Sequence, residues 1–251
     1  MSGHSKWATT KHRKAAVDAK RSKLFSKLSR IITVAAKTGG DPNPANNAPL
    51  AAAIEKARGY SLPKDRIQAA VDKAFGSGES ANFEEIIYEG YGPCGVAFYV
   101  ESLTDNRNRT AADVRALFTR AGGNLGATGS VTFLFERVGE IAVAKSSVAD
   151  EEELLLQIAD AGGEDLEDAG DDLVVITAPG DLMSVKRALE AAGVATTGAD
   201  LTMRAKTETE LGVGDARKVM RLVDGLEDLD DIQEVYHNMA MTEELQAALD
   251  E

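Results

Sequence analysis

The hydrophobic pattern of this chain changes at residues 83–100, which read Phe-Glu-Glu-Ile-Ile-Tyr-Glu-Gly-Tyr-Gly-Pro-Cys-Gly-Val-Ala-Phe-Tyr-Val. The segment from Ile86 to Tyr91 predicts a strand, and Gly92-Pro93 predicts the turn that ends it. From Val96 to Val100 apolar residues alternate between two faces, which is typical of a second strand. Because the sequence before residue 83 has the period of helices, this stretch marks the start of an α+β region.

Three short amphipathic helices are predicted before residue 83. The first carries an apolar face from Leu24 to Ala35, the second begins near Pro49, and the third runs from Pro63 to Gly76. Asn46 or Asn47 can cap the second helix. The cations of the first helix fall mainly off its apolar face, so we expect them along its solvent side; they are Lys20, Lys23, Lys27 and Arg30.

After residue 100 the chain alternates between helix and strand patterns. Asp105 to Arg109 is predicted to be a polar loop, and Thr110 to Asp113 resembles a capping box that opens a helix ending at Gly122-Gly123. Val131, Phe133 and Phe135 alternate as in a strand. The later predicted elements are a strand at Ile141 and Val143, a helix from Glu151 to Ala161, a strand from Leu173 to Thr177, a helix from Asp181 to Ala192, a strand from Thr196 to Ala205, a helix at Ala216 to Val223 and a strand from Ile232 to Tyr236.

This order predicts an α+β protein with an N-terminal three-helix domain followed by two ferredoxin-like α+β domains, one inserted in the other. The last helix and strand complete the first α+β unit, which otherwise lacks them. We therefore expect a basic arm and helical domain at residues 1–78, a discontinuous first α+β domain at residues 79–137 and 207–251, and an inserted acidic domain at residues 138–206.

Charge is divided unevenly along the chain. The formal net charge is −13, yet residues 1–149 hold 14 acids and 21 bases, whereas residues 150–251 hold 27 acids and 7 bases. The net charges of the two parts are therefore +7 and −20. This asymmetry indicates a polyanion partner for the N-terminal part, because the C-terminal part repels one.

The first 23 residues are basic and contain the only tryptophan of the chain, Trp7. Asp18 is their one acid, and their cations are Lys6, Lys11, Arg13, Lys14, Lys20, Arg21 and Lys23. Such a segment is the electrostatic footprint of a nucleic-acid contact, and an indole among the cations can stack on an unpaired base. The alternative is a solvated tail whose charges contact nothing, which gives no reason for placing Trp7 there.

The remaining composition predicts a cytoplasmic protein without a membrane partner. Cys94 is the only cysteine, so neither an internal disulfide nor a cysteine-based zinc site can form. No apolar run approaches the roughly 20 residues that span a bilayer, and the N-terminus lacks the apolar core of a secretion signal. We expect no metal and no cofactor.

Four motifs resemble those of the YebC/PmpR family, in the same order. They are Gly3-His-Ser-Lys-Trp7 with Lys11-His-Arg-Lys14, Tyr88-Glu-Gly-Tyr-Gly-Pro93, Leu103-Thr-Asp-Asn-Arg-Asn-Arg-Thr110, and Gly123-Asn-Leu-Gly126 with Thr128-Gly-Ser-Val131. The resemblance covers essentially the whole chain. It implies a helical domain and two nested α+β domains, in agreement with the pattern above. Cys94 and Ala127 depart from it, since glycine and an acid are expected there.

The resemblance also implies a function, in two versions. Members of the family, which includes the mitochondrial translational activator of cytochrome oxidase, are usually described as transcriptional regulators that bind DNA. The alternative is a ribosome-associated translation factor that binds ribosomal RNA and relieves stalling at sequences such as consecutive prolines. The residues favour RNA, because we find no helix that aims Asn, Gln and Arg at base edges and no Cys/His finger. Promoter DNA and ribosomal RNA both stay open as partners, as does the oligomeric state.

A nucleic-acid contact through the arm gives its side chains separate roles. The cations neutralise phosphates, Trp7 stacks, and His12 donates a hydrogen bond. Arg107 and Arg109 precede a predicted helix N-terminus and are a second candidate contact, although the sequence slightly favours the alternative of a surface loop with two solvated arginines. The predicted nucleic-acid-binding set is Lys6, Trp7, Lys11, His12, Arg13, Lys14, Lys20, Arg21, Lys23, Arg107 and Arg109.

Two other segments have structural explanations. The Gly-rich stretch from Gly123 to Gly129 lacks the Lys-Ser/Thr ending of a phosphate loop and no helix follows it, which favours a tight turn into a strand. The acidic segments from Glu164 to Asp168 and from Asp228 to Asp231 lack the spacing of a calcium loop, so we expect them to be solvated.

An enzyme is the rival class, and we expect no catalytic residues. No nucleophile motif brackets a serine, and Cys94 has no cation nearby in the sequence. His4 and His12 lie in the arm, while His237 lies near the other end of the chain. A third class is a protein-interaction module whose acidic domain docks a basic partner, and this role can coexist with nucleic-acid binding.

Overall fold

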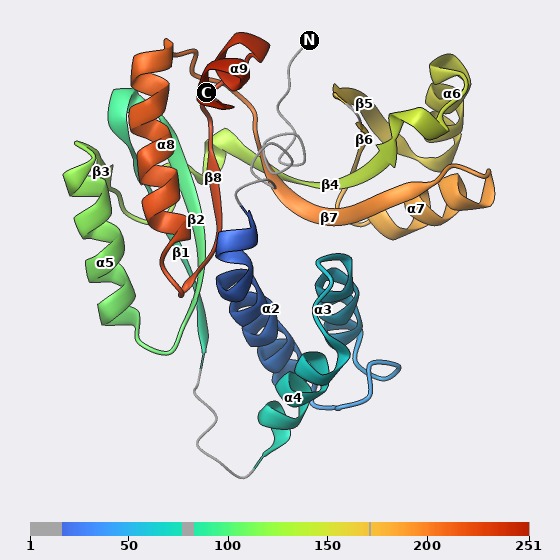
Figure 1. Ribbon diagram of the computed structural model, residues 1–251, viewed down its shortest axis with the longest axis horizontal. Coiled ribbons are helices and arrows are strands. Elements are labelled where there is room, and N and C mark those ends of the chain that lie inside the picture. Colours follow the sequence, from blue (N-terminus) through green and yellow to red (C-terminus); the bar gives the residue numbers. More distant parts are fainter. Residues whose placement is uncertain (1–16, 77–82, 171, 251) are drawn as a thin grey trace.

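The computed structural model describes residues 17–76, 83–170 and 172–250 (Figure 1). These residues form an N-terminal helical bundle and two four-stranded antiparallel sheets, which confirms the predicted α+β class. All four strands of the second sheet come from one continuous segment of the chain, and the first sheet is completed by a strand that follows that segment. The second α+β unit is therefore inserted in the first.

The helical bundle contains α2 (Val17–Gly39), α3 (Ala48–Gly59) and α4 (Lys64–Phe75). Its core is aliphatic, and Ile32 and Leu50 are fully buried. Asn47 is the cap of α3, because its side-chain oxygen accepts a hydrogen bond from the Leu50 amide at 3.0 Å. The Asn47 amide nitrogen also donates to the carbonyls of Ala35 and Ala36 at 3.3 Å. One side chain thus joins the end of α2 to the start of α3.

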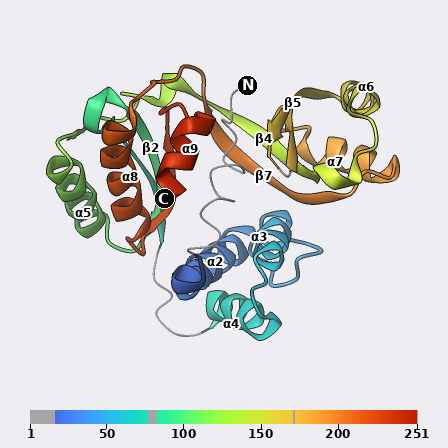
Figure 2. The ribbon, with the colours of Figure 1, turned by 45° about the horizontal axis from the view of Figure 1, so that its top comes forward.

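The first sheet has the strand order β3-β1-β2-β8, with β1 (Glu84–Tyr91), β2 (Ala97–Thr104), β3 (Asn124–Leu125) and β8 (Ile232–His237). Helices α5 (Arg107–Arg120) and α8 (Val213–Glu227) lie side by side along this sheet (Figures 1 and 2). The core is formed between them and the sheet, where Phe98 meets Phe118 edge to face at 5.6 Å between ring centroids. Helix α9 (Glu243–Asp250) adds the buried Leu245 to the same core.

The second sheet has the order β5-β6-β4-β7, with β4 (Phe135–Ala144), β5 (Gly163–Ala169), β6 (Asp172–Thr177) and β7 (Thr196–Ala205). Helices α6 (Glu151–Ala161) and α7 (Leu182–Ala191) cover one face through buried side chains such as Ile158 and Val185. This β-α-β-β-α-β order is that of a ferredoxin-like module. The first unit has a different order. It begins with the β1–β2 hairpin, continues through α5 and β3, and is completed by α8 and β8 after the inserted unit.

Short 3-10 turns lie at Pro93–Gly95, Thr132–Leu134 and Lys145–Ser147. In the first of them Cys94 has a φ of 59°, in the left-handed region that favours glycine. The backbone at this turn therefore explains why the family resemblance leads us to expect glycine at position 94.

The predicted start of the helix at Thr110 is wrong. Helix α5 begins at Arg107, because the Asn106 side chain accepts a hydrogen bond from the Arg109 amide at 3.1 Å and acts as the cap. Arg107 and Arg109 accordingly belong to the first turn of the helix and not to a loop. The Thr110 hydroxyl, which was expected to cap, instead donates to the carboxylate of Asp231 at 2.7 Å.

The predicted strand from Val131 to Phe135 is also wrong, because Thr132–Leu134 is a 3-10 turn and β4 begins at Phe135. The amides of Val131 and Thr132 donate to the carboxylate of Glu89 at 2.8 Å each, so they do not pair with another strand. The acidic segment from Glu164 to Asp168 lies in the edge strand β5, where Glu164, Asp165 and Asp168 are exposed as expected and Glu167 is paired with Arg204.

Candidate nucleic-acid interface

The sequence predicts that the cations of α2 are directed to solvent, but not all of them are. The Lys27 ammonium donates to the Glu227 carbonyl at 2.9 Å, and Lys23 lies 3.3 Å from the carboxylate of Asp228. Burial lowers the pKa of Lys27, and the charge of Glu227 only partly offsets this effect. The solvent-side prediction is therefore wrong for Lys27 and also for Arg30, whose side chain is 21 % exposed, whereas Lys23 keeps 47 % of its side chain exposed.

Arg30 extends the same contact and is the third cation directed at the turn after α8. Its guanidinium donates to the carbonyls of Leu103 and Asp230 at 3.0 Å and to the carboxylate of Asp231 at 2.9 Å. It also lies over the ring of Phe83, 5.1 Å from the centroid. The basic side of α2 thus docks the helical bundle on the first α+β unit.

Asp231 is the centre of this contact, which contradicts its prediction as a solvated acid. Its carboxylate accepts from Arg30 and Arg109, at 2.9 and 2.7 Å, and from the hydroxyls of Thr104 and Thr110, at 3.2 and 2.7 Å. Burial alone raises the pKa of Asp231, but the hydrogen bonds from Arg109 and Thr110 and the two positive charges hold it below the ordinary value. The motif from Leu103 to Thr110 therefore builds a binding site for an internal carboxylate.

The two predicted contacts on α5 differ in their surroundings. Arg109 is shared between the carboxylates of Asp105, at 2.9 Å, and Asp231, at 2.7 Å. Arg107 is exposed, and its side chain makes no ion pair with a described residue. Of these two arginines, Arg107 has the charge that is available to an external anion.

Further ion pairs fix the helical bundle against both sheets. Lys56 of α3 lies 2.7 Å from Asp200 of β7 and 3.5 Å from Glu234 of β8. Glu55 lies 3.4 Å from Lys186 of α7. Because these pairs are partly exposed, each contributes little alone, and together they define the orientation of the bundle.

The Gly-rich segment encloses an internal carboxylate. Glu89 is 2 % exposed and accepts from the amides of Gly129, Val131 and Thr132 at 2.7, 2.8 and 2.8 Å. Burial raises the pKa of Glu89, yet these hydrogen bonds outweigh it and lower the net value. A Cβ on Gly126 would lie 2.4 Å from the Ser130 hydroxyl, so the turn needs glycine there. The amides of this loop already hold an anion, which argues against a phosphate loop.

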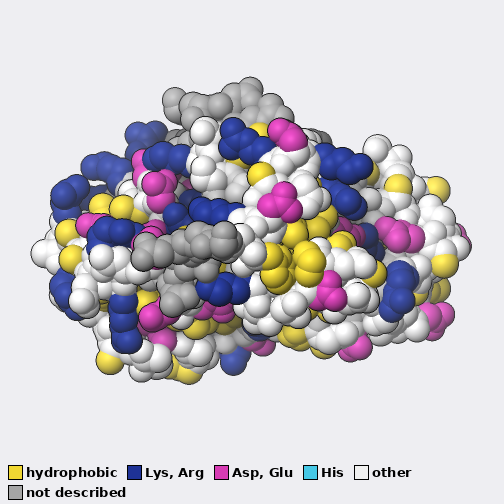
Figure 3. Space-filling view, turned by 90° about the horizontal axis from the view of Figure 1, so that it is seen from below, with side chains coloured by type: hydrophobic (Ala, Val, Ile, Leu, Met, Phe, Trp, Pro, Cys, Tyr) yellow, Lys and Arg dark blue, Asp and Glu magenta, His cyan; other side chains and the backbone are white. Residues whose placement is uncertain are grey.

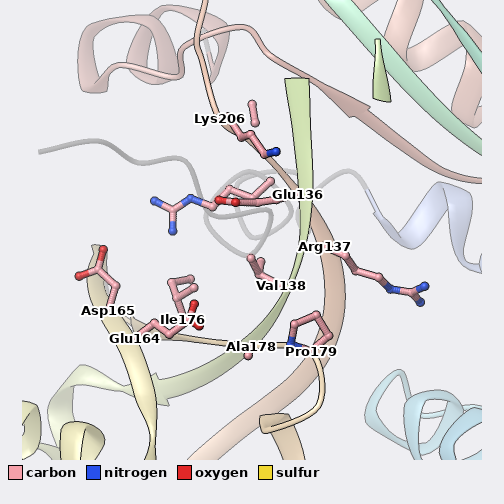
Figure 4. Close-up of a pocket in the computed structure, with 11 residues that line it drawn as sticks. Glu136, Arg137, Val138, Glu164, Asp165, Ile176, Ala178, Pro179 and Lys206 are labelled. Atoms are coloured by element: carbon pink, nitrogen blue, oxygen red, sulfur yellow. The ribbon is translucent and has the colours of Figure 1, made fainter. Parts of the chain in front are cut away.

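A cavity of about 510 Å³ opens beside the second sheet (Figure 4). Its charged lining residues are three acids and three bases, Glu136, Glu164, Asp165, Arg137, Arg204 and Lys206. Arg137 extends away from the two acids of β5 in the close-up. Such a balanced lining has no preference for a polyanion. Within the described ranges no three His, Cys, Asp or Glu side chains are grouped as metal ligands.

Most of the predicted arm contacts cannot be placed. Lys6, Trp7, Lys11, His12, Arg13 and Lys14 lie outside the described residues. Lys20 and Arg21 are in α2, but their side chains are not described.

The sequence does not indicate three further exposed arginines on α5 and α8, Arg115, Arg120 and Arg221. No motif of the sequence marks them, and Asp113 and Asp224 lie two and three residues from Arg115 and Arg221. No helix in the described part of the chain has the length and apolar character needed to cross a membrane.

The chain is similar to known proteins over its whole length. Residues 5–77 match a family model described as the TACO1/YebC protein N-terminal domain, and residues 83–239 match one described as the TACO1/YebC second and third domain. A "Probable transcriptional regulatory protein" of Bifidobacterium animalis subsp. lactis is 53 % identical over 100 % of both chains. One of the same description from Rubrobacter xylanophilus is 50 % identical over 98 % of both.

The fold is also found in a solved structure. The crystal structure of a conserved hypothetical protein from Aquifex aeolicus superposes with a TM-score of 0.80 at 45 % identity, covering 90 % of this chain and 93 % of that one. The resemblance seen in four sequence motifs therefore extends to all three structural units.

Proposed function

The chain belongs to the TACO1/YebC family, and from this we propose that it is a non-enzymatic, nucleic-acid-binding regulator of gene expression. The proposed contact is the basic N-terminal arm, residues 1–23. Its relatives are named "Probable transcriptional regulatory protein", which supports the regulatory part of the proposal.

One observation carries the proposal: the separation of charge along the chain. Residues 1–23 hold seven Lys and Arg side chains and one acid, in a protein whose net charge is −13. An acidic protein gains no solubility from a basic segment, because that segment reduces its net charge. A phosphate backbone binds a cluster of Lys and Arg side chains favourably, because binding releases counterions from the nucleic acid.

The geometry around the arm supports its use as a contact. The helix that continues from the arm, α2, is held on the body of the protein by Lys27 and Arg30. A nucleic acid bound by the arm is therefore connected to a fixed helix rather than to a free chain. The acids that predominate in the C-terminal part repel the same nucleic acid, which favours contacts at basic surfaces away from those acids.

The proposal includes two target classes, promoter DNA and ribosomal RNA. Phosphate contacts position a protein without reading sequence, so the arm alone binds either one. Trp7 favours a target with unpaired bases, because stacking on an indole requires a base that is free of its partner.

The test compares the wild-type protein with Lys11→Glu/Lys14→Glu. Fluorescence anisotropy measures the affinity for a labelled DNA duplex and for a labelled RNA hairpin across a range of salt concentrations. Reversing the charge of two phosphate-binding lysines is expected to weaken the affinity at least about 10-fold. The plot of log K against log salt is expected to become less steep, by about 2 in the magnitude of its slope. The matched control is Lys64→Glu/Lys73→Glu on α4, where both side chains are exposed. Equal losses in the two variants, or no binding by the wild type, would contradict the proposal.

A further inference from the structure

Two stretches of the chain contain cations and no acid. Residues 150–251 hold seven bases, and three of these, Arg217, Lys218 and Arg221, fall within five residues of α8. Residues 114–132 contain Arg115 and Arg120 and no acid, and residues 216–223 also contain no acid. Asp113, Asp215 and Asp224 bound these stretches, so the absence of acids is local.

The fold brings the two stretches together. The start of α5 lies near the end of α8, because Arg109 contacts Asp231 at 2.7 Å. Further along, a Cβ on Gly225 would lie 3.2 Å from the Leu117 side chain, so the helices approach closely there. The two helices therefore run antiparallel, side by side in both ribbon views (Figures 1 and 2). This direction places the end of α5 beside the middle of α8.

Three of the five cations have no internal partner. Arg115, Arg120 and Arg221 are exposed and make no hydrogen bond or ion pair with a described residue. The other two, near the start of α8, have internal partners: Lys218 lies 2.7 Å from Asp215, and Arg217 donates to the Ala248 carbonyl of α9 at 3.0 Å. In the space-filling view, Lys and Arg side chains gather at the end of the molecule where α5 lies (Figure 3).

The surface lacks the features of a protein-binding site. Interfaces between proteins are centred on exposed aromatic or aliphatic side chains. The large exposed hydrophobic side chains among the described residues lie on other elements, and none is on α5 or α8. Arginines without an apolar centre match the phosphates of a nucleic acid, which are spaced anions that accept paired hydrogen bonds.

We propose that Arg115, Arg120 and Arg221 form a second nucleic-acid contact that binds the phosphate backbone, separate in sequence from the N-terminal arm. This contact rests on the proposed function, since it requires that the protein bind nucleic acid. It gives the bound backbone two points of attachment, one on the arm and one on the α5–α8 layer. Two attachments fix the direction in which the nucleic acid crosses the protein, which a single arm does not.

The test removes the three charges without reversing them, in Arg115→Ser/Arg120→Ser/Arg221→Ser. The matched control is Lys64→Ser/Arg66→Ser/Lys73→Ser on α4, which removes the same charge from exposed positions. Anisotropy measures binding to a labelled DNA duplex and to an RNA duplex of the same sequence, which distinguishes the two sources of phosphate. Because the three arginines lack internal partners, both variants are expected to unfold at the same urea concentration as the wild type.

For duplex DNA, the triple variant is expected to bind at least about 10-fold more weakly. The magnitude of its slope of log K against log salt is expected to be about 3 smaller than that of the wild type. The α4 control is expected to keep the wild-type slope. Equal slopes for the triple variant and the control would overturn the second contact, while a loss with the arm variant would leave the proposed function standing. Absence of any wild-type binding would overturn both. Binding of poly-glutamate, but of neither duplex, would assign the surface to an acidic protein and also overturn the proposal.

Discussion

Asp231 joins three segments that are distant in the sequence. Its carboxylate binds Arg30 of α2 and Arg109 of α5, and it lies at the turn between α8 and β8. Because it is 8 % exposed, its charge depends on these partners rather than on water. The carboxylate is thus one of the points at which the helical bundle meets the discontinuous α+β unit, beside the contacts of Lys27 and Lys23.

Asp231→Asn is expected to lower the free energy of unfolding by about 2 kcal/mol, because Arg30 and Arg109 are left beside a neutral group. Urea denaturation measures the change. Asp230→Asn is the control, since Arg30 contacts the backbone carbonyl of Asp230 and not its carboxylate. If both variants were as stable as the wild type, Asp231 would not be the centre of the contact.

The same residue predicts a pH dependence. The folded-state pKa of Asp231 lies below the ordinary value of 3.8, so its stabilising contribution is complete above that value. The contribution is lost as the pH falls through the lower folded-state pKa. The stability difference between the wild type and Asp231→Asn is therefore expected to shrink below about pH 4. A difference that stays constant on acidification, measured by urea denaturation at each pH, would contradict the assigned charge state.

At the scale of elements, the loop between β3 and β4 is organised by one strand residue, Glu89. The carboxylate accepts three amide hydrogen bonds from Gly129, Val131 and Thr132. An internal carboxylate in this position fixes the loop in the way that a bound anion fixes a phosphate loop. The direction of the chain into β4 follows from this contact.

Glu89→Gln replaces one acceptor oxygen with an amide donor, which faces amide donors of the loop. At least one of the three hydrogen bonds is expected to be lost, at a cost of about 1–3 kcal/mol. Hydrogen exchange at the amides of Val131 and Thr132 is expected to accelerate more than exchange at the core strand residue Val100. Unchanged exchange at all three amides would show that the loop does not depend on Glu89.

Elements with strong local signals are predicted at their observed bounds. Helix α6 begins after Asp150, which caps it, and ends at Gly162, whose φ is positive. Strand β7 is observed at Thr196–Ala205, as predicted. In these cases the residues that end the element lie within it or next to it in the sequence, so no distant contact is needed to find them.

Elements decided by distant contacts are missed. Asn106 and Thr110 are both good caps, and the choice between them depends on Asp231, which is 121 residues from Thr110. The candidate site is limited in the same way. The sequence indicates which cations are available, but it does not show that Lys27 and Arg30 are used internally while Arg115 and Arg120 are not.

At the scale of the whole molecule, cations have two uses. Those on one side of α2 hold the helical bundle on the rest of the protein, and those on the arm, α5 and α8 are proposed to hold nucleic acid. The nested order of the two sheets is confirmed, whereas the domain boundaries near residues 78, 137 and 206 stay predictions. The separation of charge along the sequence favours contact of a polyanion with the N-terminal part of the chain.

The central claim, that the arm contacts nucleic acid, is tested most directly by ultraviolet cross-linking in living cells. The protein is purified under denaturing conditions after irradiation, and the covalently attached nucleic acid is labelled and treated with DNase or RNase. The account predicts attached nucleic acid on the wild type and a severalfold loss for Lys11→Glu/Lys14→Glu, with the sensitive nuclease identifying DNA or RNA. Attachment at background level in the wild type, or equal attachment in the variant, would contradict the account.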